Sequence, residues 1–277
     1  MGFRINTNVS SIAAQRALNT TNRMSQNTLA KMSSGTRITR AADDAAGLAI
    51  SEKLKAQIRS MQQADRNAND GISMVQTAEG GLDEISNMLT RLRELSIQSA
   101  SDTVGDTERA FSNQEYQQLK LEIERIAQVT EFNGTKLLAG EGDMLDFQIG
   151  VNNDAFQDRI SYDTQMTNAK LSSLGIDMID VSSKEGAQTA LSTIDDAIEK
   201  VSGQRAALGA IQNRLTSTSN NLQISTENLS QANSRIRDVD YAQAAADNAK
   251  NNILGQAGTS VLSQANAQGQ NALKLIG

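Results

Sequence analysis

The chain has 277 residues and a formal net charge of −6 at pH 7, and it contains no His, Cys, Pro or Trp. Without His and Cys it lacks the side chains that usually move protons near neutral pH or act as thiolates, which argues against an enzyme and against a Cys-based zinc site. The absence of Pro fits long uninterrupted helices, because an interior Pro removes a backbone donor and clashes with the preceding turn.

The first segment, residues 1–42, carries a thin apolar face and an unbalanced charge, with six basic residues and no acidic residue. The apolar positions are Ile5, Val9, Ile12, Ala13, Ala17, Leu29 and Met32. A basic N-terminal arm can bind nucleic acid or an anionic membrane. Here the charges stand singly along an alanine-rich helical pattern, without aromatic side chains on which bases would stack, so we expect neither partner.

The N-terminal residues also bear on localisation. They lack the continuous apolar core of a cleaved secretory signal, and the chain contains no run of about 18 apolar residues that would predict a membrane span. If the protein is extracellular, we expect it to leave the cell by a route that reads no cleaved signal.

Residues 33–47, which read SSGTRITRAADDAAG, predict a loop that leads into the next helix. Asp43 or Asp44 suits the N-cap, where a carboxylate accepts hydrogen bonds from free backbone amides. Arg37 and Arg40 stand close to these aspartates and offer charge pairs across a subunit boundary. We favour this assembly role and call residues 33–47 the spoke. We expect no metal site here, since adjacent carboxylates at a helix start are usually caps.

A long helix is predicted from about Ala45 to Ser99 by two rows of residues at seven-residue spacing. The first row is Met61, Ala68, Val75, Leu82 and Leu89, and the second is Ala64, Gly71, Ala78, Ile85 and Leu92. Gly80 and Gly81 each weaken a helix by about 1 kcal/mol relative to Ala, so a bend at this pair is compatible with one helix.

A shorter helix and a β segment follow. Tyr116, Leu119, Ile123 and Ile126 have helical spacing, and the turn signal Phe132-Asn133-Gly134 predicts the helix end. From about Thr135 to Asp180 the helical period fails, and short apolar runs broken by Gly and Asn-Asn-Asp predict β-hairpins. This segment is too small for a core of its own.

The clearest heptad pattern comes next. Its main row is Ile194, Val201, Leu208, Leu215, Leu222, Leu229 and Ile236, and its second row is the more polar set Ala197, Gln204, Ile211, Thr218, Ser225 and Ala232. Such rows predict a long helix packed in coiled-coil fashion, and the diluted second row indicates several neighbours.

The C-terminal residues predict a helix that pairs with the N-terminal one. Leu254, Gly258, Val261, Ala265, Ala272 and Leu275 alternate four and three residues apart. Since Ala and Gly contribute little apolar area, neither terminal helix buries enough surface alone, and we expect both to order on meeting each other or other subunits. The predicted fold is mainly α: a long antiparallel coiled-coil-like bundle with a small β-hairpin segment, plus a paired terminal-helix domain. The predicted domains are 1–42 with 241–277, and 43–240.

These residues resemble bacterial flagellin over nearly the whole chain. The N-terminal match includes Ile5-Asn6-Thr7-Asn8 and residues 29–100, and the C-terminal match includes SGQRAALGAIQNRL, NLQISTENLSQANSRIRDVDYA and ILGQAGTSVLSQANAQGQNAL. The resemblance implies a structural subunit that polymerises into the hollow flagellar filament, with the terminal helices lining its inner channel. It further implies unfolded export through the flagellar type III apparatus and, as partners, an export chaperone, a cap protein and hook-junction proteins. Because the insert between Gly134 and Asp180 is minimal, we expect no outer domain and no cofactor.

The resemblance also suggests an epitope for innate immunity. Flagellins sensed by their Toll-like receptor present an Arg and a Leu four residues apart, which match Arg91 and Leu95, and a Glu that matches Glu115. The Gln that precedes the Arg in the family is Thr90 here. The alternative is that these residues serve subunit packing.

Two other functions stay open at this point. A hook–filament junction protein shares the architecture but attaches to another protein's lattice. An enzyme within the filament is the second, although residues 135–180, free of His and Cys, leave almost no room for a catalytic insert.

Overall fold

The computed structural model describes residues 7–274, with side chains as far as Ala267. Two of the predicted apolar positions, Ile5 and Leu275, and the side chain of Ala272 therefore lie outside the described part.

The chain forms two compact units. We call residues 1–56 with 228–277 the terminal unit, and residues 57–227 the central unit. The boundaries between these units fall inside two long helices. The predicted domains were instead divided at 42/43 and 240/241, outside these helices, and that division stays a prediction about assembly.

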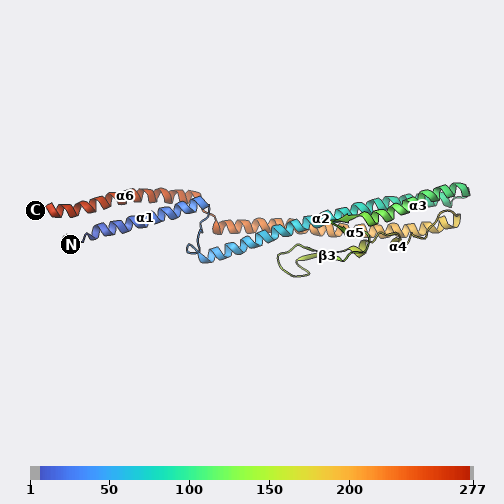
Figure 1. The fold of residues 1–277 in the computed structure, drawn as a ribbon, viewed down its shortest axis with the longest axis horizontal. Helices are drawn as coiled ribbons and strands as arrows, with labels where there is room; N and C mark the ends of the chain where they lie inside the picture. The colour runs from blue at the N-terminus through green and yellow to red at the C-terminus, as the bar shows by residue number, and fades with distance from the viewer. Residues whose placement is uncertain (1–6, 275–277) are drawn as a thin grey trace. The chain divides into compact units, whose positions relative to one another are not determined.

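The described residues are mainly helical, as predicted. The helices are α1 (Val9–Ser34), α2 (Ala45–Ala100), α3 (Asp106–Val129), α4 (Leu171–Leu174), α5 (Lys184–Arg237) and α6 (Tyr241–Lys274), with a 3₁₀-helix η1 (Thr164–Thr167). The strands are β1 (Glu131–Phe132), β2 (Thr135–Lys136), β3 (Met144–Gln148) and β4 (Arg159–Asp163). Figure 1 shows their order along the chain.

Within the central unit α2 and α5 run antiparallel. Contacts made by later residues of α2 involve earlier residues of α5. Arg93 Nε lies 2.6 Å from Asp195 Oδ1, and Arg205 lies 2.9 Å from Asp83. Further along, Ser219 Oγ donates to Asp65 Oδ1 at 2.5 Å. This confirms the predicted antiparallel helical bundle.

The heptad rows form the core of the central unit. In α2 the first row is buried from Ala68 onward, the second row is buried throughout, and both rows continue into the buried Ser96 and Ser99. In α5 the main row is buried from Ile194 to Leu222. A polar member of its second row contacts the irregular segment between the helices: Gln204 Nε2 donates to the Asn168 carbonyl at 3.0 Å.

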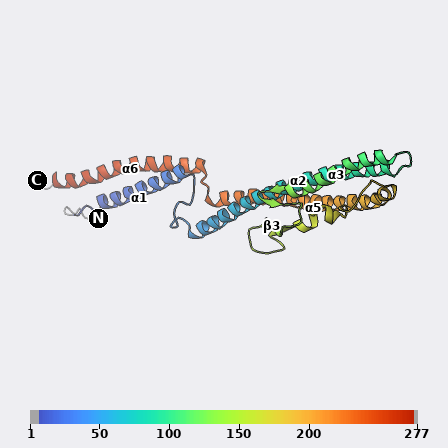
Figure 2. The ribbon, with the colours of Figure 1, turned by 45° about the vertical axis from the view of Figure 1, so that its right-hand side comes forward.

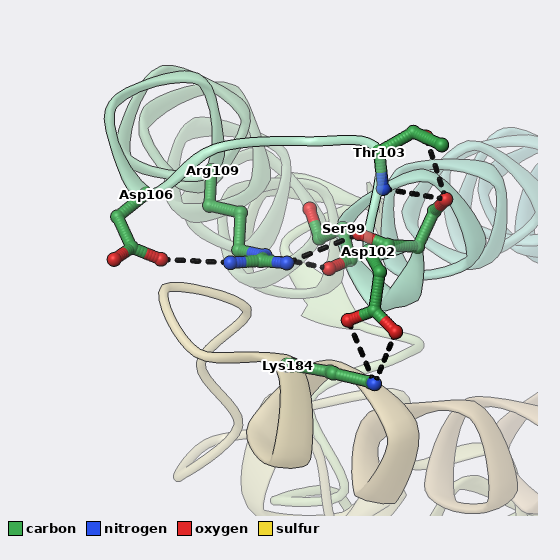
Figure 3. A network of polar contacts seen from close by, with 7 residues as sticks. Ser99, Asp102, Thr103, Asp106, Arg109 and Lys184 are labelled. Atoms are coloured by element: carbon green, nitrogen blue, oxygen red, sulfur yellow. Dashed lines mark hydrogen bonds and ion pairs between the residues drawn. The ribbon is translucent and has the colours of Figure 1, made fainter.

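Helix α3 is joined to the end of α2 by a polar network (Figure 3). The Arg109 side chain is nearly buried and donates to the carbonyl oxygens of Ser99, at 2.9 Å, and Ser101, at 3.0 Å. A cation at this position satisfies carbonyls that the helix end leaves without partners. Asp102 in the connecting loop pairs with Lys184, the first residue of α5, at 2.7 Å.

The segment between α3 and α5 contains two antiparallel strand pairs, as predicted. One difference concerns the end of α3, which stops at Val129, so Phe132 belongs to strand β1 and Asn133-Gly134 form the turn to β2. The longer pair, β3 and β4, has Phe147 opposite Ile160. Ile149, Ile160 and Tyr162 join the helical core, which is why this short segment needs no core of its own.

The glycine pair of α2 is explained by packing against this segment, and α2 continues through it as one helix. A Cβ added at Gly81 would lie 2.7 Å from Leu138 Cδ1 and 2.9 Å from Thr130 Oγ1, which is too close. A Cβ at Gly80 would meet nothing within 4 Å. Gly81 therefore allows the segment after α3 to approach the helix closely.

The terminal unit is built on α1 and α6, which lie side by side and antiparallel (Figures 1 and 2). Asn8 Nδ2 donates to the Ala265 carbonyl at 2.8 Å, while at the other end Thr36 and Asp238 form an antiparallel bridge. None of the helices in the described part is both long and apolar enough to cross a membrane.

Candidate functional site

The seam between α1 and α6 is filled by small and polar side chains. On α1 the half-buried positions recur at three- and four-residue spacing: Ser11, Ala14, Leu18, Thr21, Ser25, Thr28 and Met32. On α6 they are Asn248, Asn251, Gly255, Gly258, Leu262 and the buried Ala265. Leu18 packs at Gly258, where an added Cβ would lie 3.2 Å from Leu18 Cδ1, and Ser11 Oγ donates to Asn266 Oδ1 at 2.7 Å.

Apart from Leu18, Met32 and Leu262, the larger apolar side chains of this pair point away from the seam. Val9, Ile12 and Leu29, which the sequence placed on an apolar face, are exposed, as are Leu254 and Val261 on α6. Met24 and Ile253, which sequence reasoning did not single out, are exposed as well. Helix α1 contains no buried residue, so its apolar face is uncovered in the single chain.

Most of the charge of α1 is uncompensated, although Lys31 interacts electrostatically with Asp43. Within the described residues no ion pair includes a residue of α1, although Arg16, Arg23 and Lys31 are basic. Arg23 Nε donates only to the Asn19 carbonyl of its own helix, at 3.4 Å. An apolar face flanked by unpaired positive charge suits a partner that carries both apolar and acidic side chains.

The spoke is anchored to the end of α5 by backbone hydrogen bonds. The Arg37 amide donates to the Arg237 carbonyl at 2.6 Å, and the Arg37 guanidinium donates to the Ile236 carbonyl at 2.8 Å. Beside it, Ile38 is buried. Arg37 is thus occupied as a cap for the last carbonyls of α5, a role for which a cation is well suited.

The two aspartates of the spoke have different roles. Asp43 Oδ2 accepts hydrogen bonds from the Thr39 hydroxyl at 2.8 Å, the Thr39 amide at 3.1 Å and the Arg40 amide at 3.2 Å. These hydrogen bonds lower the pKa of Asp43 below its ordinary value, and the bond from the Thr39 hydroxyl has the largest effect. Asp44 Oδ1 accepts from the Gly47 amide at 2.8 Å and so caps α2. Of the two candidates for the cap, the structure selects Asp44.

Gly47 completes this arrangement because it leaves no room for a side chain. A Cβ there would overlap Asp44 Oδ2 and lie 2.8 Å from Ile38 Cδ1. Arg40, by contrast, is exposed, and its guanidinium makes no hydrogen bond or ion pair with the part of the chain that the structure describes. The spoke therefore holds a fixed turn from which Arg40 projects.

The second candidate site lies on α2 and α3. Arg91 is exposed and pairs with Glu115 and Glu94, each at 2.9 Å, and the hydrogen bonds that it donates to Glu94 and Glu115 raise the pKa of its guanidinium. Leu95 is only 2% exposed and belongs to the core. The structure thus brings Arg91 and Glu115 together at the surface and places Leu95 beneath it.

The described residues contain no group of three or more acidic, His or Cys side chains positioned to hold a metal ion. The features of the two sites are those of contact surfaces: exposed apolar side chains, a basic helix and charged turns that are held by hydrogen bonds.

Family models match most of the chain. The model of the bacterial flagellin N-terminal helical region matches residues 5–143, and that of the C-terminal helical region matches residues 191–276.

Similar proteins match the chain almost from end to end. A flagellin of Halalkalibacterium halodurans is 44% identical over 274 residues, which cover 98% of this chain and 99% of that protein. A flagellar filament 33 kDa core protein of Treponema phagedenis is 43% identical over 285 residues and covers 98% of this chain and 99% of its own length. Among solved structures, a crystal structure of Bacillus cereus flagellin superposes with a TM-score of 0.50 at 32% identity, covering 57% of this chain and 88% of that chain.

Proposed function

The chain belongs to the bacterial flagellin family, and from this we propose that it is a structural subunit that polymerises into the flagellar filament, the hollow helical propeller of motility. Its relatives are filament proteins and not enzymes, and like them it is a part of the flagellum.

The observation that carries this proposal is the outward apolar face of the α1–α6 pair. Fully burying a Val, Leu or Ile side chain contributes about 1.5–3 kcal/mol, and the exposed residues of this face would gain that only by contact with other chains. A seam of small residues lets α1 and α6 approach closely while their larger side chains stay available for neighbours. The pair is therefore suited to packing inside a polymer.

We assign residues 1–42 and 241–277 to the inner wall of the filament tube, and residues 43–240 to the layer around it. The support is the difference in burial: the described part of the first set lacks a core of its own, whereas the heptad rows of the central unit are covered by their own chain.

The spoke residues Arg37, Arg40, Asp43 and Asp44 would connect these layers. Arg37, Asp43 and Asp44 keep the turn in place through their hydrogen bonds. Arg40, whose guanidinium has no partner among the described residues, is the one that we expect to pair with a carboxylate of another subunit.

We further propose that the chain reaches the cell exterior unfolded, through the flagellar type III apparatus, and meets an export chaperone, a cap protein and hook-junction proteins on the way. A chain without Cys forms no disulfide that would have to be broken before export. Terminal helices that gain their stability from neighbours are also easily kept unfolded.

A host Toll-like receptor is a further proposed partner, through Arg91 and Glu115. Their side chains are about half exposed and paired, so they present a fixed polar surface. Leu95 would act from below, by packing, since its side chain is buried. An Arg91→Ala variant should lose receptor activation in a cell reporter assay, with Arg93→Ala, another arginine of α2 that pairs with a carboxylate, as the matched control. Full activity of Arg91→Ala would contradict this role.

The test of the filament proposal is seeded polymerisation. Ile12→Ser and Val261→Ser each remove one apolar side chain from the outward face, and a loss of about 1.5–3 kcal/mol corresponds to a roughly 10- to 150-fold higher critical concentration. Gln15→Ser, an exposed polar position on α1, is the control. Deletion of residues 1–42 or 241–277 should abolish growth. If purified wild-type chain stays monomeric when seeded or salted out, the result would contradict the filament proposal and favour the hook–filament junction alternative.

A further inference from the structure

The loop between β3 and β4 is held in one conformation by its own side chains. The Asp158 carboxylate is only 6% exposed and accepts hydrogen bonds from the Asp154 amide at 3.0 Å and the Asn152 amide at 3.4 Å. Gln148 Nε2 donates to the carbonyl oxygens of Gly150, at 3.0 Å, and Asn152, at 2.8 Å. The loop is thus fixed to the strand that precedes it.

The tip of this loop presents a phenylalanine. Asp154 Oδ1 accepts hydrogen bonds from the amides of Phe156 and Gln157, both at 2.9 Å, which fixes the backbone on which the ring is carried. The Phe156 side chain is 92% exposed. A solvated loop gains nothing from a bare aromatic ring, whereas a rigid aromatic side chain is the kind of anchor that dominates protein interfaces.

A hollow lies beside the loop, between it and α5 in the central unit. Its volume is about 530 Å³, and Phe156 stands at its rim. A second hollow of about 460 Å³ adjoins it and shares part of its lining. The two hollows are lined by apolar and polar side chains, among them Ile149, Ile160, Arg214, Ser217, Thr218 and Leu222.

The loop carries the exposed carboxylate of Asp154, whereas the hollow is lined by Arg214 together with Arg159 and the buried Asp158. Arg214 in the hollow is exposed and makes no side-chain hydrogen bond or ion pair with any described residue. On the loop, the amides of Gln157 and Phe156 lower the pKa of Asp154, so this carboxylate stays ionised. A guanidinium can also lie against an aromatic ring, and such contacts contribute about 0.5–2 kcal/mol.

We propose that the Phe156 loop of one subunit docks in the hollow between the β3–β4 loop and α5 of a neighbouring subunit, with Phe156 against Arg214. The loop offers an aromatic ring and an ionised carboxylate, and the hollow offers apolar side chains and a guanidinium that is unpaired among the described residues, so the fitting partner is a second copy of this chain. This inference rests on the proposed filament function, because a filament brings identical surfaces together in a repeating head-to-tail contact.

The contact is small and would not hold a filament together alone. One side chain in a hollow buries far less than the roughly 1,200 Å² of a stable interface. It therefore adds to the contacts of the terminal helices, and its loss should weaken filaments without preventing their growth.

Cross-linking between two single-cysteine variants tests the contact directly, because the natural chain contains no Cys. Ala155→Cys places a thiol beside Phe156 without removing the ring, and Ser217→Cys places one in the hollow of the partner. Filaments grown from an equal mixture should give disulfide-linked dimers on oxidation, whereas filaments of either variant alone should give none. Ser202→Cys, an exposed position on α5 about 22 Å from residue 217, is the matched control and should not cross-link with Ala155→Cys.

The outcomes separate this proposal from the filament proposal. Intact mixed filaments without dimers would overturn the docking, and so would dimers in Ala155→Cys filaments alone, since the loops would then meet each other. Failure to form filaments at all would instead overturn the proposed function. As a second measurement, Phe156→Ala should leave the unfolding of the monomer unchanged and lower the temperature at which filaments dissociate. Dissociation at the wild-type temperature would contradict the proposal.

Discussion

Two helical seams in this chain follow the same spacing and differ in what fills them. In the central unit, α2 and α5 meet through Val, Leu and Ile side chains that their own chain covers completely. In the terminal unit, α1 and α6 meet mainly through Ser, Thr, Asn, Gly and Ala, with Leu18, Met32 and Leu262 as the larger apolar residues of the seam, and the other large apolar residues face outward. The apolar residues of the first seam stabilise the fold of a single chain. The residues of the second seam bury little apolar area, so α1 and α6 gain the rest of their stability from other chains. The comparison predicts opposite responses of the two units to similar substitutions.

The largest effect is expected in the central unit. Leu89 is fully buried, so Leu89→Ala should lower the free energy of unfolding of the monomer by about 2–5 kcal/mol, through lost burial and the cavity left behind. Urea denaturation followed by circular dichroism measures this. Thr90→Ala, at the exposed neighbouring position, is the control and should stay within about 0.5 kcal/mol. A Leu89→Ala effect as small as that of the control would mean that the seam is not the core.

The next effect depends on pH. Burial raises the pKa of Tyr116 from 10.0 to about 12, so the folded chain holds this proton more tightly than the unfolded chain. Stability from this group is complete below about pH 10 and is lost as the pH rises toward 12, by roughly 2–3 kcal/mol in all. The measurement is the fall in the urea midpoint between about pH 9 and pH 11.5. Tyr116→Phe should show a smaller fall than the wild type, because the contribution of Tyr116 is absent. An unchanged loss would show that other groups cause it.

A smaller and opposite pair of effects is expected at the glycines of α2. Gly80→Ala should stabilise the central unit by about 1 kcal/mol, because a methyl group there meets nothing and favours the helix. Gly81→Ala should destabilise it by about 1–3 kcal/mol, since the methyl group would collide with Leu138 and Thr130. Thermal unfolding of the two variants measures the difference. Equal shifts in the same direction would contradict the close approach at Gly81.

The smallest effect on the monomer is expected in the terminal unit. Ile12→Ala removes an exposed side chain, so the free energy of unfolding of the monomer should change by no more than about 0.5 kcal/mol. The same substitution should weaken polymerisation, as measured by the critical concentration. A loss of several kcal/mol in the monomer would mean that the α1 face is already covered within one chain.

The sequence predicted the long helices and the β-hairpins well, because heptad rows and alternating apolar runs are strong local signals. It did not separate the two faces of α1: Ile12 and Leu29 looked like contact residues, whereas the contact row contains Ser25 and Thr28. Apolar spacing identifies an apolar face but not the partner that covers it. A seam of small and polar residues leaves almost no hydrophobic signal.

The candidate sites were predicted only in part, for similar reasons. The sequence offered Asp43 and Asp44 equally as caps, and only the turn geometry gives the cap to Asp44. Leu95 stood outside both heptad rows and is buried all the same. Phe156 was not singled out either, because one aromatic residue in a loop has no pattern, and its meaning depends on the hydrogen bonds of Asp154 and Asp158.

Hydrogen exchange of backbone amides tests the central claim most directly, because it reports helix stability segment by segment in monomer and filament alike. We expect amides of α1 and α6 to exchange rapidly in the monomer and to become protected in the filament, while those of the buried stretches of α2 and α5 are protected in both. Protection of α1 in the monomer equal to that of α2 would contradict the claim that the terminal unit is completed by other subunits.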